Sequence, residues 1–81
     1  MQNKVSVRIH IDTVAKVKEF VRTISEQPLE TELRSGRFVV DAKSIMGIFS
    51  LNISEPVELV LHGNEEDVDA ALEKLEAFIA A

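Results

Sequence analysis

Hydrophobic residues follow two different spacings along the chain, and these spacings divide it into strands and helices. Strict alternation of apolar and polar residues is typical of a strand with one buried face, whereas apolar residues at i, i+3 and i+4 indicate an amphipathic helix. Alternation predicts four strands, at Val5–Ile11, Leu29–Arg34, Arg37–Ala42 and Val57–His62. Helical spacing predicts three helices, beginning near Val14, near Ile45 and just after Asn64.

Residues at the ends of these segments agree with the assignment. Asp12 or Thr13 offers a side-chain oxygen to cap the first helix, Ser44 caps a short second helix that runs to about Leu51, and Asn64 caps the third. The apolar stripe of the third helix continues through Ile79 towards the C-terminus. Ser35-Gly36 is typical of a hairpin turn between the second and third strands, because glycine tolerates a positive φ.

The order β-α-β-β-α-β-α predicts an α+β fold, a two-layer open-faced sandwich in which helices cover one face of a four-stranded antiparallel sheet. In the third strand, Phe38, Val40 and Ala42 are expected on the inner face. Residues 1–81 show no linker, repeat or low-complexity stretch, so we expect a single domain.

Composition narrows the function classes. The net charge is −5, with 14 acidic and 9 basic residues, which argues against a nucleic-acid partner. The chain has no cysteine, no glycine-rich phosphate loop and no apolar run long enough to span a bilayer. We therefore expect a cytoplasmic protein with no membrane association and no cofactor.

Two histidines are the main candidates for catalytic or metal chemistry. His10 and His62 both fall on the polar face, and we expect them to be neighbours if the first and last strands pair. Together with Glu58 they offer three ligands, whereas a structural metal site normally has four fixed ones. Two surface histidines are the simpler reading, and we expect no metal site and no catalytic residue.

The most unusual segment is the second helix. Ile48 and Leu51 suffice to anchor so short a helix, yet Ile45, Met46 and Phe49 are also large and apolar. Methionine beside an aromatic residue at an exposed site suits adaptable protein binding. The alternative is that loops or the first helix cover these side chains.

The residues Lys43-Ser44-Ile45-Met46-Gly47-Ile48-Phe49-Ser50-Leu51, the strand after them and the acidic turn that opens the last helix resemble the HPr family. HPr proteins are the small phosphocarriers of the bacterial sugar phosphotransferase system. The element order is similar to the HPr-like fold over nearly the whole chain. The resemblance implies that Ser44 is the target of a regulatory ATP-dependent kinase. It also implies that Ile45, Met46, Gly47 and Phe49 belong to a docking surface for partner proteins.

The chain departs from the family pattern in one loop. HPr proteins carry the phosphoryl group on a histidine in a Gly-x-His-x-Arg-Pro loop before the first helix. Here the corresponding residues are Ile11-Asp12-Thr13-Val14-Ala15-Lys16, without histidine, arginine or proline. Thr13 lies nearest the histidine position, and His10 lies earlier, within the strand pattern.

Together these features predict an HPr-like regulatory or protein-binding module, related to sugar transport and carbon catabolite control. Expected partners are phosphotransferase-system components, an HPr-type kinase or a transcriptional regulator. Two alternatives stay open: an active phosphocarrier that uses a displaced histidine such as His10, and a constitutive interaction domain in which Ser44 is only a helix cap.

Overall fold

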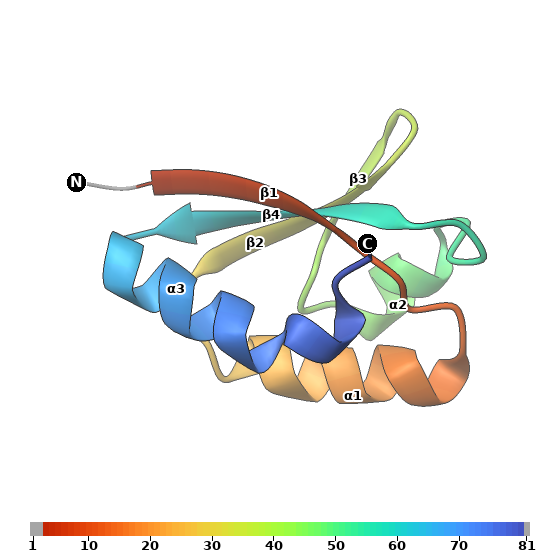
Figure 1. The fold of residues 1–81 in the computed structure, drawn as a ribbon. Helices are drawn as coiled ribbons and strands as arrows, with labels where there is room; N and C mark the ends of the chain where they lie inside the picture. Colours follow the sequence, from red (N-terminus) through yellow and green to blue (C-terminus); the bar gives the residue numbers. More distant parts are fainter. Residues whose placement is uncertain (1–2, 81) are drawn as a thin grey trace.

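The computed structural model describes residues 3–80, and they form one four-stranded antiparallel sheet with the helices packed on one of its faces (Figure 1). The α+β architecture is the one that the sequence predicts. The elements are β1 (Asn3–Ile9), α1 (Val14–Ser25), β2 (Glu30–Ser35), β3 (Phe38–Asp41), α2 (Ile45–Phe49), β4 (Val57–Gly63), α3 (Glu65–Lys74) and a 3₁₀ turn, η1 (Glu76–Phe78).

The strands lie in the order β1-β4-β2-β3, so β1 and β3 are the two edges. β4 is one of the two interior strands, and it pairs with β1 from Asn3↔Gly63 to Ile9↔Val57. On its other side β4 pairs with β2, from Glu30↔His62 to Arg34↔Glu58. β2 and β3 form a hairpin that is closed by the pair Ser35↔Phe38.

The core lies between the sheet and the helices, because each element turns its apolar stripe inward. Phe20 of α1 is fully buried and meets the ring of Phe78 edge-on, with ring centroids 5.8 Å apart. The other large side chains with no exposed surface are Ile9, Ile11, Val17, Ile24, Leu33, Ile48, Leu59, Leu61 and Leu75.

The structure decides between Asp12 and Thr13 as the N-cap of the first helix. Thr13 is the N-cap of α1, and its hydroxyl oxygen accepts a hydrogen bond from the backbone N–H of Lys16 at 3.1 Å. Ser44 and Asn64 cap α2 and α3 as the sequence predicts.

One expectation about the chain's course was wrong. The last helix does not run to Ile79 but ends at Lys74, after which Ile79 bridges to Ile9 beside the end of β1. Phe38 alternates with Val40 onto the inner face as expected, but its side chain is 64% exposed rather than part of the core. Figure 1 shows that the β2–β3 hairpin projects beyond the helical layer.

No helix within residues 3–80 is long and apolar enough to cross a membrane.

Candidate docking and phosphorylation site

The start of α2 is built by a short series of local hydrogen bonds. Asp41 accepts two of them, from the backbone N–H of Lys43 at its carboxylate (2.9 Å) and from the N–H of Ser44 at its carbonyl (3.0 Å). Ser44 Oγ then accepts from the backbone N–H of Gly47 at 3.2 Å. This is the usual N-cap arrangement, which satisfies one of the free N–H groups of the first helical turn. The Ser44 side chain is exposed, so a modifying enzyme has access to it.

Lys43 has a structural role that the sequence did not reveal. Its ammonium group donates to the carbonyl oxygens of Gln27 and Leu29, both at 2.9 Å. These carbonyls belong to the segment that follows α1. Lys43 therefore ties the start of α2 to the end of the first helix, and its charge is directed into the molecule rather than towards Ser44.

The apolar residues of α2 divide into an anchored and an exposed set. Ile48 is fully buried, and Ile45 is half-buried and packs against the same core. Met46 is 83% exposed and Phe49 is 45% exposed. We expected that the large apolar residues of this segment could not all follow Ile48 inward, and this holds for Met46 and Phe49. These two side chains form an exposed apolar surface, two and five residues after Ser44.

Gly47 lies where the backbone approaches two side chains closely. A Cβ atom at this position would be 3.2 Å from Ser44 Oγ and 3.2 Å from Val40 Cβ. The φ angle of Gly47 is not in the left-handed region, so space rather than backbone conformation favours glycine here.

The loop before α1 holds a second group of polar side chains. Lys16 Nζ donates to Asp12 Oδ1 at 3.0 Å, and His10 Nε2 lies 3.7 Å from Asp12 Oδ2. The hydrogen bond from Lys16 lowers the pKa of the Asp12 carboxyl, and the nearby His10 adds to this effect. Helices α1 and α2 are in contact, and Figure 1 shows α2 beside the first half of α1. Thr13 and Ser44 therefore cap two neighbouring helices.

The two histidines are not neighbours. The register of β1 and β4 places His62 opposite Lys4, at the start of β1, whereas His10 follows the last residue of that strand. At about 3.3 Å per residue, six residues of extended chain separate the two positions by roughly 20 Å. His62 instead lies 3.7 Å from Glu32 across the sheet.

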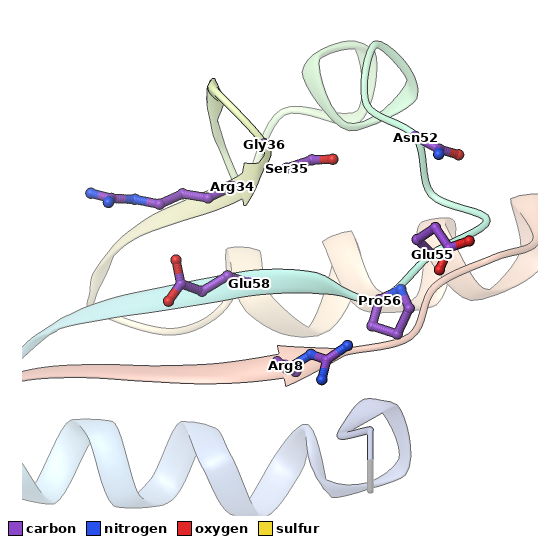
Figure 2. Close-up of a pocket in the computed structure, with 8 residues that line it drawn as sticks. All are labelled: Arg8, Arg34, Ser35, Gly36, Asn52, Glu55, Pro56 and Glu58. Carbon is purple, nitrogen blue, oxygen red and sulfur yellow. The ribbon is translucent and has the colours of Figure 1, made fainter.

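A mixed-charge hollow lies on the open face of the sheet, and the sequence analysis did not identify it. The strand register aligns Arg8, Glu58 and Arg34 in one row across β1, β4 and β2. Figure 2 shows these side chains beside the β2–β3 turn and the loop before β4. The complete lining is Arg8, Arg34, Ser35, Gly36, Asn52, Glu55, Pro56 and Glu58. Arg34 donates to Glu32 at 3.0 Å, and this bond lowers the pKa of Glu32.

Sequence and structure comparisons agree on the relatives of this chain. It is 38% identical to the HPr-like protein Crh of Bacillus subtilis, over 98% of this chain and 94% of that protein. The solution structure of Crh, the catabolite repression HPr of B. subtilis, is 34% identical, has a TM-score of 0.59 and covers 98% of this chain and 95% of its own. HPr-C-His from Thermoanaerobacter tengcongensis is 30% identical with a TM-score of 0.70, covering 93% and 92% of the two chains.

A phosphocarrier protein HPr from Bacillus anthracis has the same fold, with a TM-score of 0.71, 24% identity and 98% of both chains covered. The family model described as the phosphorylation site of the phosphotransferase-system HPr component matches residues 4–81. This chain belongs to the HPr family of the phosphotransferase system.

Proposed function

We propose that this HPr-family protein is a regulatory, protein-binding module rather than a histidine phosphocarrier, and that phosphorylation of Ser44 controls it. The observation that carries the proposal is the adjacency of an exposed serine cap and an exposed apolar surface. Ser44 caps α2, and Met46 and Phe49 of the same helix are turned to solvent. A modification at the cap therefore acts beside the surface on which a partner would dock.

Thr13, at the start of α1, supports a regulatory role over a phosphocarrier role. By the family resemblance, the phosphoryl-accepting histidine belongs at the N-terminus of this helix, and here Thr13 is the N-cap. A phosphothreonine ester does not transfer its phosphoryl group onward as a phosphoimidazole does. The similarity to a protein described as the catabolite repression HPr points in the same direction.

Phosphorylation would act through charge. A phosphate group on Ser44 adds about −1.5 to −2 charge at neutral pH. The nearest basic residue in the sequence, Lys43, already donates to Gln27 and Leu29 and is not available to neutralise it. The new charge would lie two residues before Met46 and five residues before Phe49, at the start of the same helix. A partner that prefers an apolar surface would then bind more weakly, and one with a basic rim would bind more tightly.

The modification can be tested directly. The protein is incubated with ATP and an HPr-type kinase, and the product is mapped by mass spectrometry. We expect one phosphate on Ser44 and none on a Ser44→Ala variant. Ser50→Ala is the matched control, because Ser50 is an exposed serine at the other end of the same helix. An unmodified Ser44 under conditions that phosphorylate a known HPr substrate would remove this mechanism.

The docking surface has its own test. The double variant Met46→Ser/Phe49→Ser removes the exposed apolar side chains and leaves the half-buried Ile45 in place. We expect it to lose binding to phosphotransferase-system components or a transcriptional regulator that wild type retains. Val39→Ser is the control, since Val39 is also more than half exposed but belongs to β3. Equal binding by all three proteins would show that α2 is not the docking surface.

The main alternative is phosphotransfer through His10. Its side chain is 43% exposed and its imidazole lies beside Asp12, so a donor protein could reach it. Phosphoenolpyruvate and the general enzyme of the system would then produce an acid-labile, base-stable phosphohistidine that is absent from His10→Ala. No labelling of the wild-type protein would exclude this alternative.

A further inference from the structure

The outer edge of β3 differs from that of β1. At β1 the C-terminal segment covers the end of the strand, because the Ala80 N–H donates to the Arg8 carbonyl and the His10 N–H to the Phe78 carbonyl, both at 2.8 Å. Within residues 3–80, no segment pairs in this way with the outer edge of β3 between Phe38 and Val40. An unprotected edge strand is a template for pairing with another strand.

The side chains of this edge are apolar on both faces of the sheet. Val40 faces α2, since its Cβ would be only 3.2 Å from a Cβ at Gly47, and by alternation Phe38 faces the same way. Val39 therefore points to the open face. Phe38 and Val39 are 64% and 53% exposed. Exposed edges commonly carry lysine or proline as protection, and β3 has neither; its protection is limited to its short length of four residues and to Asp41 at its end.

Hairpin geometry identifies the free backbone groups. Gly36 has φ of +59° as the first residue of the two-residue turn between Ser35 and Phe38, which is typical of a type II′ turn. In such a turn Phe38 directs its N–H towards β2. Because hydrogen-bonding direction alternates along an antiparallel strand, the N–H and C=O of Val39 point outward, as does the N–H of Asp41.

We infer that β3 is a self-association edge, and that its partner is β3 of a second copy of this chain. A two-fold axis at Val39 would pair the strands antiparallel. Val39 would lie opposite Val39, Phe38 opposite Val40, and Arg37 opposite Asp41 of the second copy. The two Val39 residues would exchange two backbone hydrogen bonds, and each Asp41 N–H would donate to an Arg37 carbonyl.

Charge complementarity favours a second copy over an arbitrary extended peptide. Arg37 and Asp41 lie two residues on either side of Val39, so the two-fold axis creates two opposite-charge pairs and no like-charge pair. The same symmetry matches apolar side chains with one another on both faces. The result would be an eight-stranded sheet with both helical layers on one side.

Self-association should be weak, because a four-residue strand buries little surface. We therefore expect a monomer–dimer equilibrium in sedimentation equilibrium only as the concentration approaches about 1 mM. In NMR spectra, dilution should shift the amide signals of residues 37–41 and leave those of residues 4–8 in β1 unchanged. A monomer at every concentration, or dilution shifts confined to β1, would overturn the inference.

Variants at the axis sharpen the test. Val39→Lys places two ammonium groups opposite each other and should weaken association by about tenfold or more. Arg37→Glu and Asp41→Lys should each weaken it, because each puts like charges together, and the double variant should restore it. That recovery cannot arise from damage to the fold. Val14→Ser, at an exposed apolar residue of α1, is the control and should associate as wild type does. Association that is insensitive to Val39→Lys, or a double variant weaker than both single ones, would refute pairing at this edge.

Discussion

The hydroxyl oxygen of Ser44 accepts a hydrogen bond from the backbone N–H of Gly47 at 3.2 Å, the same distance at which a Cβ on residue 47 would meet that oxygen. Glycine at this position therefore leaves the cap unobstructed. The cap and the proposed phosphorylation site are one atom. Any change at Ser44 consequently alters the stability of α2 and the charge beside Met46 together, and experiments must separate the two effects.

Substitutions at Ser44 can separate them. Ser44→Ala should lower the free energy of unfolding by about 1 kcal/mol, because the Gly47 N–H loses its acceptor. Ser44→Asn and Ser44→Asp should both stay close to wild type, since asparagine and aspartate cap helices as well as serine does. Urea unfolding followed by circular dichroism measures all three.

The same variants test regulation when partner binding is compared. If charge at the cap controls docking, Ser44→Asp should change partner affinity and Ser44→Asn should not. If Ser44 is only a structural cap, all folded variants should bind alike, and Ser44→Ala should differ from wild type in stability alone.

Removing the ammonium group of Lys43 should destabilise the fold more than removing the cap. Lys43→Met keeps most of the aliphatic chain but leaves the carbonyls of Gln27 and Leu29 without their donor. Since hydrogen bonds to charged groups are stronger than neutral ones, we expect a loss of roughly 2 kcal/mol in urea unfolding. Lys18→Met is the control, an exposed lysine of α1 that should change stability by less than about 0.5 kcal/mol. Similar losses in the two variants would contradict the proposed link between α2 and the end of α1.

The decrease in the free energy of unfolding at low pH should depend in part on Asp12. Its folded pKa lies below the ordinary value of 3.8 because Lys16 donates to its carboxylate. The unfolded chain therefore takes up the proton first as pH falls, so this contribution to stability is complete above pH 3.8 and is lost below it as the pH passes the folded pKa. In Lys16→Met, NMR titration should show the Asp12 pKa rising towards its ordinary value, whereas Lys18→Met should leave it unchanged. An Asp12 pKa that is the same in Lys16→Met and wild type would be inconsistent with this cause.

Thr31 offers a stabilising substitution. Its hydroxyl is buried on the inner face of β2 and has no hydrogen-bond partner within residues 3–80. Thr31→Val replaces it with a methyl group of similar shape and should raise the free energy of unfolding by about 1 kcal/mol. Thr23→Val should give no such gain, because the Thr23 hydroxyl already donates to the Glu19 carbonyl at 2.9 Å. A destabilised Thr31→Val would indicate that an ordered water satisfies the hydroxyl.

Local patterns in the sequence were sufficient to predict most of the fold. Alternation and helical spacing are short-range signals, and they placed all four strands and three helices in the correct order. The caps at Ser44 and Asn64 were equally readable, because each depends on a residue and its neighbours three positions later. The exposure of Met46 and Phe49 followed from the length of α2, which is too short to bury every large side chain.

The features that the sequence did not predict are set by residues distant in sequence. Phe38 alternates correctly, but whether a helix covers it depends on how far the hairpin projects. Val60 occupies a position facing the open side of the sheet, yet it is 1% exposed because it lies on an interior strand between Ser6 and Glu32. Lys43 bonds to carbonyls 14 and 16 residues away, and no local pattern reports such a contact.

The position of β1 at the sheet edge also constrains how the chain acquires its structure. β1 is made before the other strands, but among residues 3–80 the strand that pairs with it is β4, and its end is held by residues 78–80. About fifty residues must be closed into a loop before the first strand forms any of its ladder, which costs entropy and slows folding. On the ribosome, α1 and the β2–β3 hairpin emerge long before this closure. The sheet should therefore be completed only after β4 has left the exit tunnel.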